Sequence, residues 1–311
     1  MGYCRFLPND HKWRKCKWFD GKDHRPQPNR LSGEQVLQQL SVVEQTIFGK
    51  SIQQVRKRKC PADHLHWTKK SIFFDLPYWK TLTLRHNLDV MHVEKNVCDN
   101  VVGTLMNIDG KTKDTYKARL DLEYMGIKKE LHPICIDGII KMPHACYVFN
   151  KTERIMFCKF LQSIKLPDGY ASNISRCVNT KDWRIQGLKS HDCHVILQRL
   201  LPFVLRGCLR KDVSKALIQL CTFFKELTSR SLKVEVLEQL ERDIAIILCK
   251  LERIFPPGFF DVMVHLTMHL ASEALIGGPT QFRWMCPFER YDNTLQPGFL
   301  YAVIILYRIK F

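Results

Sequence analysis

A carboxylate and an imidazole stand three positions apart at Asp89 and His92, within residues 82–107, LTLRHNLDVMHVEKNVCDNVVGTLMN. Residues three apart are neighbours on a helix surface, so these two side chains can share one site. Asp89 and His92 are therefore the first candidates for functional residues.

The elements that would position this pair follow from the hydrophobic pattern. Leu82, Leu84 and Leu88 alternate with polar residues, which predicts a strand with one buried face. After Asp89 the apolar residues recur at helical spacing, at Val90, Val93, Val97, Val101 and Leu105. We therefore expect Asp89 to be a helix N-cap where a strand hands over to a helix, at the carboxyl edge of a sheet.

The net charge points to a polyanionic partner. The 311 residues contain 48 Lys+Arg against 31 Asp+Glu, a formal charge of +17. Nucleic acid is favoured over a membrane surface, because no basic amphipathic helix or lipidation motif stands out. Residues 1–70 hold 15 basic and 6 acidic side chains, 15 − 6 = +9, which is over half of the total.

The first 28 residues interleave basic and aromatic side chains. Arg14, Lys15 and Lys17 lie between Trp13 and Trp18. Basic groups attract phosphate and aromatic faces stack on bases, so these residues are candidates for DNA binding. The alternative is an extended arm whose aromatic residues pack on the body of the protein.

A compact basic run follows at Arg56, Lys57, Arg58 and Lys59. It is a second candidate DNA contact, or a nuclear-import signal, and a nuclear location is our expectation. A solvated loop is the alternative, since such runs also match by chance.

Zinc is disfavoured by the spacing of its possible ligands. The chain has 13 cysteines, which we expect to be mostly reduced and buried. No paired Cys-x₂-Cys pattern accompanies the candidate groups. These groups are Cys60, His64 and His66; His191, Cys193 and His194; and His265, His269 and Glu273.

Helices dominate the second half of the sequence. Apolar stripes at helical spacing predict four helices, within residues 190–207, 213–227, 237–254 and 261–276, that together form a bundle-like unit. Near the start of the chain, Ser32 and Gln35 have the spacing of a capping box and predict one further helix.

Long segments of the chain resemble a known family. Residues 86–133, HNLDVMHVEKNVCDNVVGTLMNIDGKTKDTYKARLDLEYMGIKKELHP, resemble the core of plant En/Spm-type (CACTA) transposases. Residues 187–207, 256–279 and 282–291 resemble the domain of unknown function that follows this core. The resemblance implies a DDE/D-type catalytic domain with an RNase-H-like fold.

The same resemblance implies roles for individual residues. Asp89 matches the second acidic residue of the family, and His92 matches the D-x-x-H signature beside it. Glu289 is a candidate third acid, with a surface ion pair near Arg290 as the alternative. The chemistry uses paired divalent ions, here Mg²⁺ if the site is complete. The first aspartate of the family lies upstream of anything present here, so we expect a truncated chain and little catalysis.

The expected fold class is mixed α/β, a partial RNase-H-like core with an appended or inserted α-helical bundle. We expect a basic arm and linker helix over 1–70, the partial core over 71–180, the helical domain over 181–291, and a divergent apolar tail over 292–311.

The expected function is DNA binding by a transposase-derived protein with defective catalysis. An active metal-dependent nuclease whose missing acid comes from elsewhere, and a helical module that binds proteins such as a full-length transposase, are the alternatives. No membrane partner is expected.

Overall fold

The computed structural model describes residues 31–42, 70–85, 87–167 and 173–284. The chain divides into two compact units. The larger unit contains residues 88–284, and the described residues before position 88 belong to the smaller one.

The described residues of the smaller unit include a short capped helix, α1 (Gly33–Gln39). The capping box that the sequence predicts is confirmed: Ser32 Oγ accepts from the Gln35 backbone N–H at 3.1 Å, and Gln35 Oε1 accepts from that of Ser32 at 2.8 Å. Gly33 lies directly against the backbone of Lys80, where a Cβ would come within 2.0 Å of the carbonyl oxygen. The described part of this unit also contains 3₁₀ turns at Leu40–Val42, Ile72–Asp75 and Trp79–Thr81.

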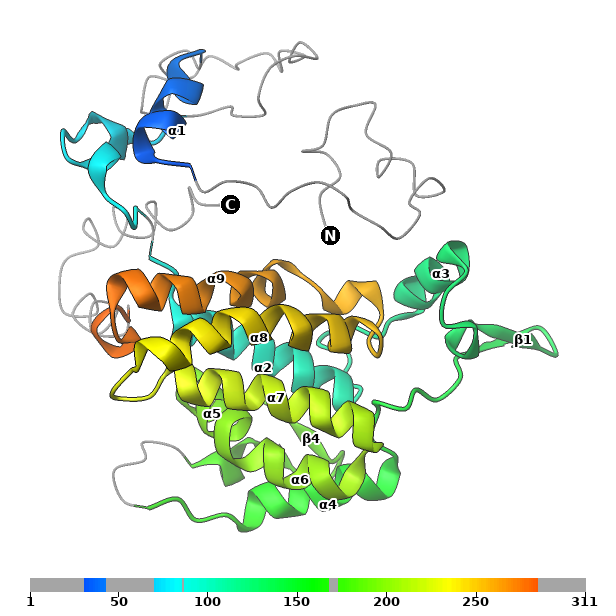
Figure 1. Ribbon diagram of the computed structural model, residues 1–311. Helices are drawn as coiled ribbons and strands as arrows, with labels where there is room; N and C mark the ends of the chain where they lie inside the picture. Colours follow the sequence, from blue (N-terminus) through cyan, green and yellow to red (C-terminus); the bar gives the residue numbers. More distant parts are fainter. Residues whose placement is uncertain (1–30, 43–69, 86, 168–172, 285–311) are drawn as a thin grey trace, which may run out of the picture. The chain divides into compact units, whose positions relative to one another are not determined.

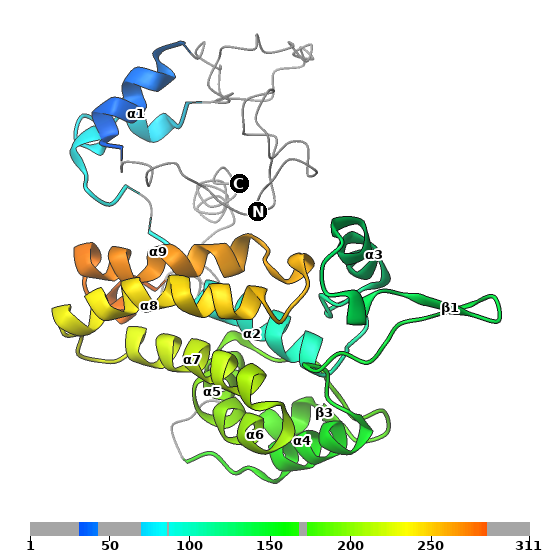
Figure 2. The ribbon, with the colours of Figure 1, turned by 45° about the vertical axis from the view of Figure 1, so that its right-hand side comes forward.

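The larger unit is mainly helical, with the mixed α/β class arising from short hairpins. Its helices are α2 (Val90–Leu105), α3 (Tyr116–Met125), α4 (Lys151–Ser163), α5 (Ser190–Val195), α6 (Leu201–Cys208), α7 (Lys211–Leu227), α8 (Val234–Glu252) and α9 (Val262–Gly277). Its 3₁₀ turns are Lys129–Leu131, Ile174–Cys177, Pro257–Phe259 and Thr280–Phe282. Figures 1 and 2 show α7, α8 and α9 side by side, with α2 packed behind them.

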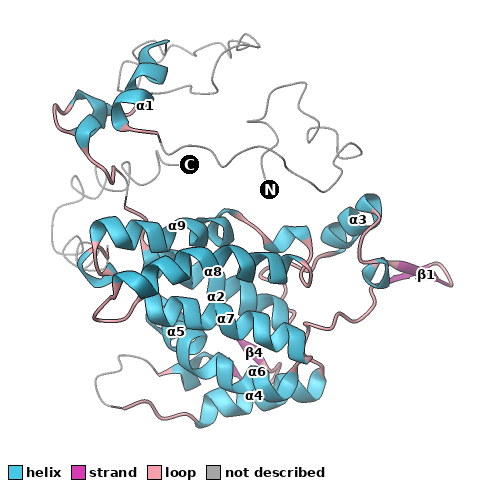
Figure 3. Cartoon of the chain, in the orientation of Figure 1, coloured by secondary structure: helices cyan, strands magenta, loops and turns pink. Residues whose placement is uncertain are grey.

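Two small antiparallel hairpins provide the strands of the described residues (Figure 3). In the first, β1 (Ile134–Ile136) pairs with β2 (Ile139–Lys141), and Cys135 faces Ile140. In the second, β3 (Val178–Asn179) pairs with β4 (Arg184–Ile185). The first hairpin is exposed along both strands, so it does not provide a layer of the core.

The strand predicted before Asp89 is wrong. Residues 82–85, 87 and 88 have no strand structure and follow the 3₁₀ turn Trp79–Thr81. The Leu88 backbone N–H donates to the Glu273 carboxylate of α9 at 3.0 Å instead of to a neighbouring strand. Leu82, Leu84 and Leu88 are each half-buried, so their alternation reflects partial burial without strand pairing.

The four helical stripes in the second half are confirmed, with one difference. The first predicted helix is two helices, α5 and α6, joined by a π-helical turn at Ile196–Leu200. Pro202 stands at the start of α6 and has no N–H to donate to the carbonyl of Gln198, which accounts for the wider turn.

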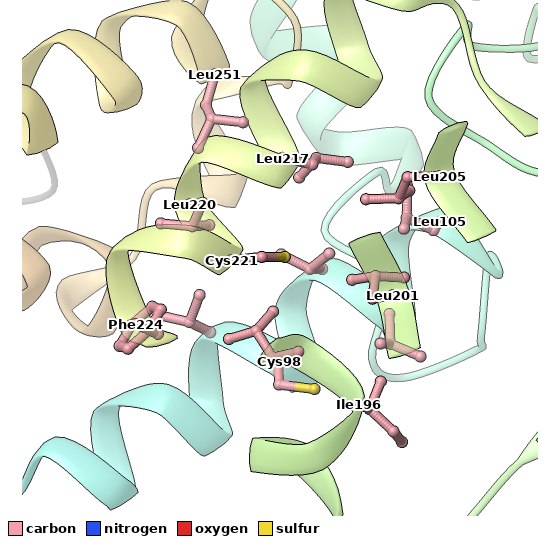
Figure 4. Close-up of a cluster of buried hydrophobic side chains, with 14 of the residues drawn as sticks. Cys98, Leu105, Ile196, Leu201, Leu205, Leu217, Leu220, Cys221, Phe224 and Leu251 are labelled. Carbon is pink, nitrogen blue, oxygen red and sulfur yellow. The ribbon is translucent and has the colours of Figure 1, made fainter. Parts of the chain in front are cut away.

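The core lies where α2, α5, α6, α7 and α8 meet (Figure 4). Its side chains are fully or almost fully buried and include Cys98, Leu105, Ile196, Leu201, Leu205, Leu217, Leu220, Cys221, Phe224 and Leu251. Each fully buried leucine or phenylalanine contributes about 1.5–3 kcal/mol relative to exposure. The sequence periodicity thus specifies the buried faces of α2, α7 and α8.

A buried ion pair fixes α3 to the chain that follows it. The Arg119 guanidinium and the Asp114 carboxylate are 2% and 6% exposed and bind through two nitrogens and two oxygens. Arg119 Nη1 also donates to the Leu131 carbonyl at 2.7 Å. Because these partners satisfy each charge, the pair can be buried without leaving an uncompensated ion.

Candidate functional site

Asp89 is the N-cap of α2, as the sequence predicts. Its Oδ1 accepts hydrogen bonds from the backbone N–H groups of Met91 (3.0 Å) and His92 (3.4 Å). Burial raises the pKa of Asp89 above its ordinary value, against the opposing effect of these two hydrogen bonds. The exposed His92 lies within the same turn, so the two residues do share a neighbourhood.

Glu273 of α9 is a buried carboxylate that contacts the residue before Asp89. It is 4% exposed, and its Oε2 accepts from the Leu88 N–H at 3.0 Å. Arg283 Nη1 lies 3.7 Å from the same oxygen. Glu273 therefore anchors the segment that enters α2, with a guanidinium balancing its charge.

His265, His269 and Glu273, the disfavoured metal group of α9, do not converge on one point. The His265 and His269 rings lie edge to face with their centroids 5.2 Å apart, on the exposed side of the helix. The Glu273 carboxylate points to the buried side instead, toward Leu88.

His194 belongs to a buried polar network. Its Nδ1 lies 2.9 Å from Oε2 of Glu94, a residue on α2 that is 1% exposed. Gln198, in the π-helical turn, donates to the other Glu94 oxygen at 2.8 Å and to the Thr228 hydroxyl at 2.8 Å. This network ties α2, α5 and the end of α7 together, and it leaves Cys193 buried against α2 beside Cys98.

No group of three His, Cys, Asp or Glu side chains with the geometry to hold a metal ion occurs among the described residues. Both carboxylates of the Asp89 region contact the chain itself: Asp89 Oδ1 caps α2, and Glu273 Oε2 accepts from a backbone N–H and lies near Arg283.

Several predicted site residues lie outside the described ranges. They are Arg14, Lys15, Lys17, Arg56, Lys57, Arg58, Lys59 and Glu289, together with the possible zinc ligands Cys60, His64 and His66.

A second concentration of positive charge lies within the larger unit. Residues 151–210 hold 11 Lys+Arg and 4 Asp+Glu, 11 − 4 = +7. With the +9 of residues 1–70, two segments carry 9 + 7 = +16 of the total of +17. Residues 151–210 contain no compact basic run, because apolar residues of α4 and α6 separate their charges. Counting charges segment by segment along the sequence would have found this concentration.

The exposed faces of α4 and α6 form one surface, which we call the α4–α6 surface. One nearly flat side of α4 carries Thr152, Ile155, Met156, Lys159, Phe160 and Ser163. Phe203 of α6 stacks on Phe160, with ring centroids 5.9 Å apart and planes at 16°. Arg199 and Arg206 flank Phe203 at helical spacing and are exposed.

Local sequence explains how these side chains come to face outward. Asn150 and Glu153 form a capping box that begins α4. Phe157, Cys158 and Leu161 then bury one side of the helix, so the stripe that contains Lys159 points away from the core. Buried Leu201 and Leu205 do the same for α6.

The positive charges of the α4–α6 surface are not neutralised within the described residues. Lys159, Arg199 and Arg206 form no ion pair there, whereas Arg210 pairs with Asp212 at 2.7 Å. The Lys159 ammonium lies 5.9 Å from the ring centre of Trp183, in the turn between β3 and β4. Basic side chains without ion-pair partners, next to exposed aromatic rings, are the composition typical of nucleic-acid interfaces.

Part of the chain matches a known domain family. Residues 227–299 match the family described as Domain of unknown function (DUF4218), and this match covers α8 and α9. No curated protein and no solved structure matches the chain. Among the helices that the structure describes, none combines the length and apolar character needed to cross a bilayer.

Proposed function

We propose that the chain is a DNA-binding protein derived from an En/Spm-type, DDE-class transposase, in which the Asp89 site does not catalyse strand cleavage. The observation that carries the DNA-binding part is the concentration of +16 of the +17 net charge in residues 1–70 and 151–210. Phosphate neutralisation by lysine and arginine supplies most of the affinity of such proteins for DNA.

Two lines support the transposase origin. The DUF4218 domain is known in plant transposase-like proteins. Residues 86–133 also resemble the core of the En/Spm-type family. The described strands are confined to two short hairpins, so the RNase-H-like fold is proposed from that resemblance alone. A nuclear location is proposed on the same ground.

The loss of catalysis is inferred from the use of the carboxylates. Asp89 accepts two backbone hydrogen bonds at the start of α2, and Glu273 is bound to Leu88 and near Arg283. A two-metal mechanism needs carboxylate oxygens free to bridge ions. The Asp89 region therefore serves to begin and anchor α2.

Salt dependence of binding tests the DNA-binding proposal. The full chain is titrated against a fluorescent 20-base-pair duplex by anisotropy at 50–300 mM NaCl. We expect the logarithm of the association constant to fall linearly with the logarithm of salt concentration, with a slope near −0.9 per phosphate contacted. Affinity that is independent of salt would contradict the proposal.

A nicking assay tests the catalytic half separately. The full chain is incubated with supercoiled plasmid and Mg²⁺, and we expect no nicking above a protein-free control. Asp89→Asn is the matched variant, because asparagine also caps helices well. Mg²⁺-dependent nicking by the wild type that Asp89→Asn abolishes would establish the active-nuclease alternative instead.

A further inference from the structure

We infer that the α4–α6 surface binds unpaired nucleic-acid strands, with bases stacking on Phe203 and phosphates contacting Lys159, Arg199 and Arg206. The inference rests on the proposed function and adds to it the form of nucleic acid that this surface recognises.

The first observation is the exposure of Phe203. Its side chain is 71% exposed although the rings of the core phenylalanines are almost fully buried. One face of Phe203 stacks on Phe160. The remaining exposed area can take a flat partner, and a nucleobase on an aromatic side chain is such a partner.

The second observation is the placement of charge around this ring. Arg199 precedes Phe203 by four residues and Arg206 follows it by three, so all three lie along one side of the helical segment. Lys159 is adjacent to Phe160 on α4. Arg199 and Arg206 therefore lie on either side of Phe203 along the helical segment, where they can contact the phosphates that flank a stacked base. Lys159 adds a third cation on α4.

The third observation is the form of the apolar surface. It comprises one stacked ring pair and, on the nearly flat side of α4, Ile155 and Met156, of which Met156 is 49% exposed. An amphipathic protein helix lays its apolar face into a hydrophobic groove, and a nearly flat surface that includes Lys159 does not provide one. The high positive charge also favours a polyanion over an apolar partner.

Unpaired strands fit this surface better than a duplex. Bases within a duplex stack on one another and offer only their edges in the grooves. An aromatic ring can stack on a base only where that base has left the helical stack. The duplex contact would then use the basic residues alone, without Phe203.

The test compares single-stranded and duplex DNA on the full chain. A mixed-sequence, 20-nucleotide fluorescent strand and its duplex are titrated by anisotropy with the wild type, Phe203→Ala, Phe203→Tyr and Ile246→Ala. Ile246 is an exposed apolar residue of α8 (53%) and serves as the matched control. Thermal unfolding confirms that each variant is folded.

We expect Phe203→Ala to weaken single-strand binding by roughly 5- to 150-fold, the range for loss of one base stack. Duplex binding is expected to stay within about twofold. Phe203→Tyr should retain single-strand affinity, because it keeps an aromatic face, and Ile246→Ala should match the wild type.

Unchanged single-strand binding by Phe203→Ala, together with salt-dependent duplex binding, would overturn this inference and leave the proposed function standing. No binding to either DNA form would overturn both.

A parallel titration uses an amphipathic peptide of alternating Glu and Leu blocks. If this peptide bound in a Phe203-dependent way and the single strand did not, the surface would be a protein-docking site and the inference would be wrong.

Discussion

Residues 151–210 and 211–261 form two neighbouring helical regions with the same kind of buried face and different exposed faces. The first has a net charge of +7, whereas the second has 8 Lys+Arg and 8 Asp+Glu, 8 − 8 = 0. Both regions bury leucine and phenylalanine side chains in one shared core. The comparison teaches that the core leaves the charge of the outer faces unconstrained, so packing in the core does not account for the charge difference.

The largest expected effect concerns two phenylalanines, one from each region. Phe224 of α7 is 0% exposed and Phe203 of α6 is 71% exposed. We expect Phe224→Ala to lower the free energy of unfolding by about 3–5 kcal/mol, through lost burial and a residual cavity. Phe203→Ala should change it by less than about 0.5 kcal/mol. Urea unfolding followed by circular dichroism measures both, and equal losses would show that Phe203 is a packing residue.

An intermediate effect is expected when charges are reversed in each region. The double variant Arg199→Glu, Arg206→Glu should reduce the salt slope of DNA binding by about 1.8, which corresponds to two phosphate contacts. The matched control reverses Lys233 and Arg242 on the neutral side, at and within α8. The control should leave the slope unchanged. If both double variants weakened binding equally, only overall charge would matter and the regional distinction would fail.

The smallest expected effect concerns the aspartates that cap α2 and α9. Burial acts to raise the pKa of Asp261, but hydrogen bonds from Asn100 (2.8 Å) and Lys113 (3.0 Å) outweigh it and hold the pKa below 3.8. Burial raises the pKa of Asp89 above 3.8. The two caps therefore affect the pH dependence of stability with opposite signs.

The opposite pKa shifts of Asp261 and Asp89 can be tested by the pH dependence of stability in two variants. The stabilisation from Asp261 is present above pH 3.8 and is lost as the pH falls through its depressed folded-state value. Asp261→Asn should therefore cost about 1–2 kcal/mol at pH 6 and little near pH 2. The folded state holds the Asp89 proton more tightly than the unfolded state, so Asp89→Asn should leave stability at pH 6 unchanged or higher. Thermal unfolding from pH 2 to 7 measures both variants; a similar loss at pH 6 would contradict the assignment for Asp89.

The sequence predicted much of the helical architecture, because helical periodicity reports directly on burial. The stripes of α7 and α8, the capping box at Ser32 and the cap at Asp89 are all confirmed. The strand before Asp89 was wrong because alternation alone does not supply a pairing partner, and Leu88 bonds instead to a side chain 185 residues away. Such a long-range contact leaves no local signal.

The α4–α6 surface was missed for a related reason. Lys159, Phe160, Arg199, Phe203 and Arg206 come together only when α4 packs beside α6. In the sequence they are spread among buried residues and form no basic run. The runs that were identified, at 14–17 and 56–59, are visible because their charges are consecutive, and they lie outside the described residues.

Lysine footprinting compares the two regions most directly. The full chain is acetylated briefly with and without saturating DNA, and modification is quantified at each lysine by mass spectrometry. We expect DNA to protect Lys159 and Lys151 of α4, while Lys215 and Lys225 of α7, which are also exposed, react equally in both samples. Protection of the α7 lysines with full reactivity at Lys151 and Lys159 would contradict the assignment of the nucleic-acid interface to the basic region.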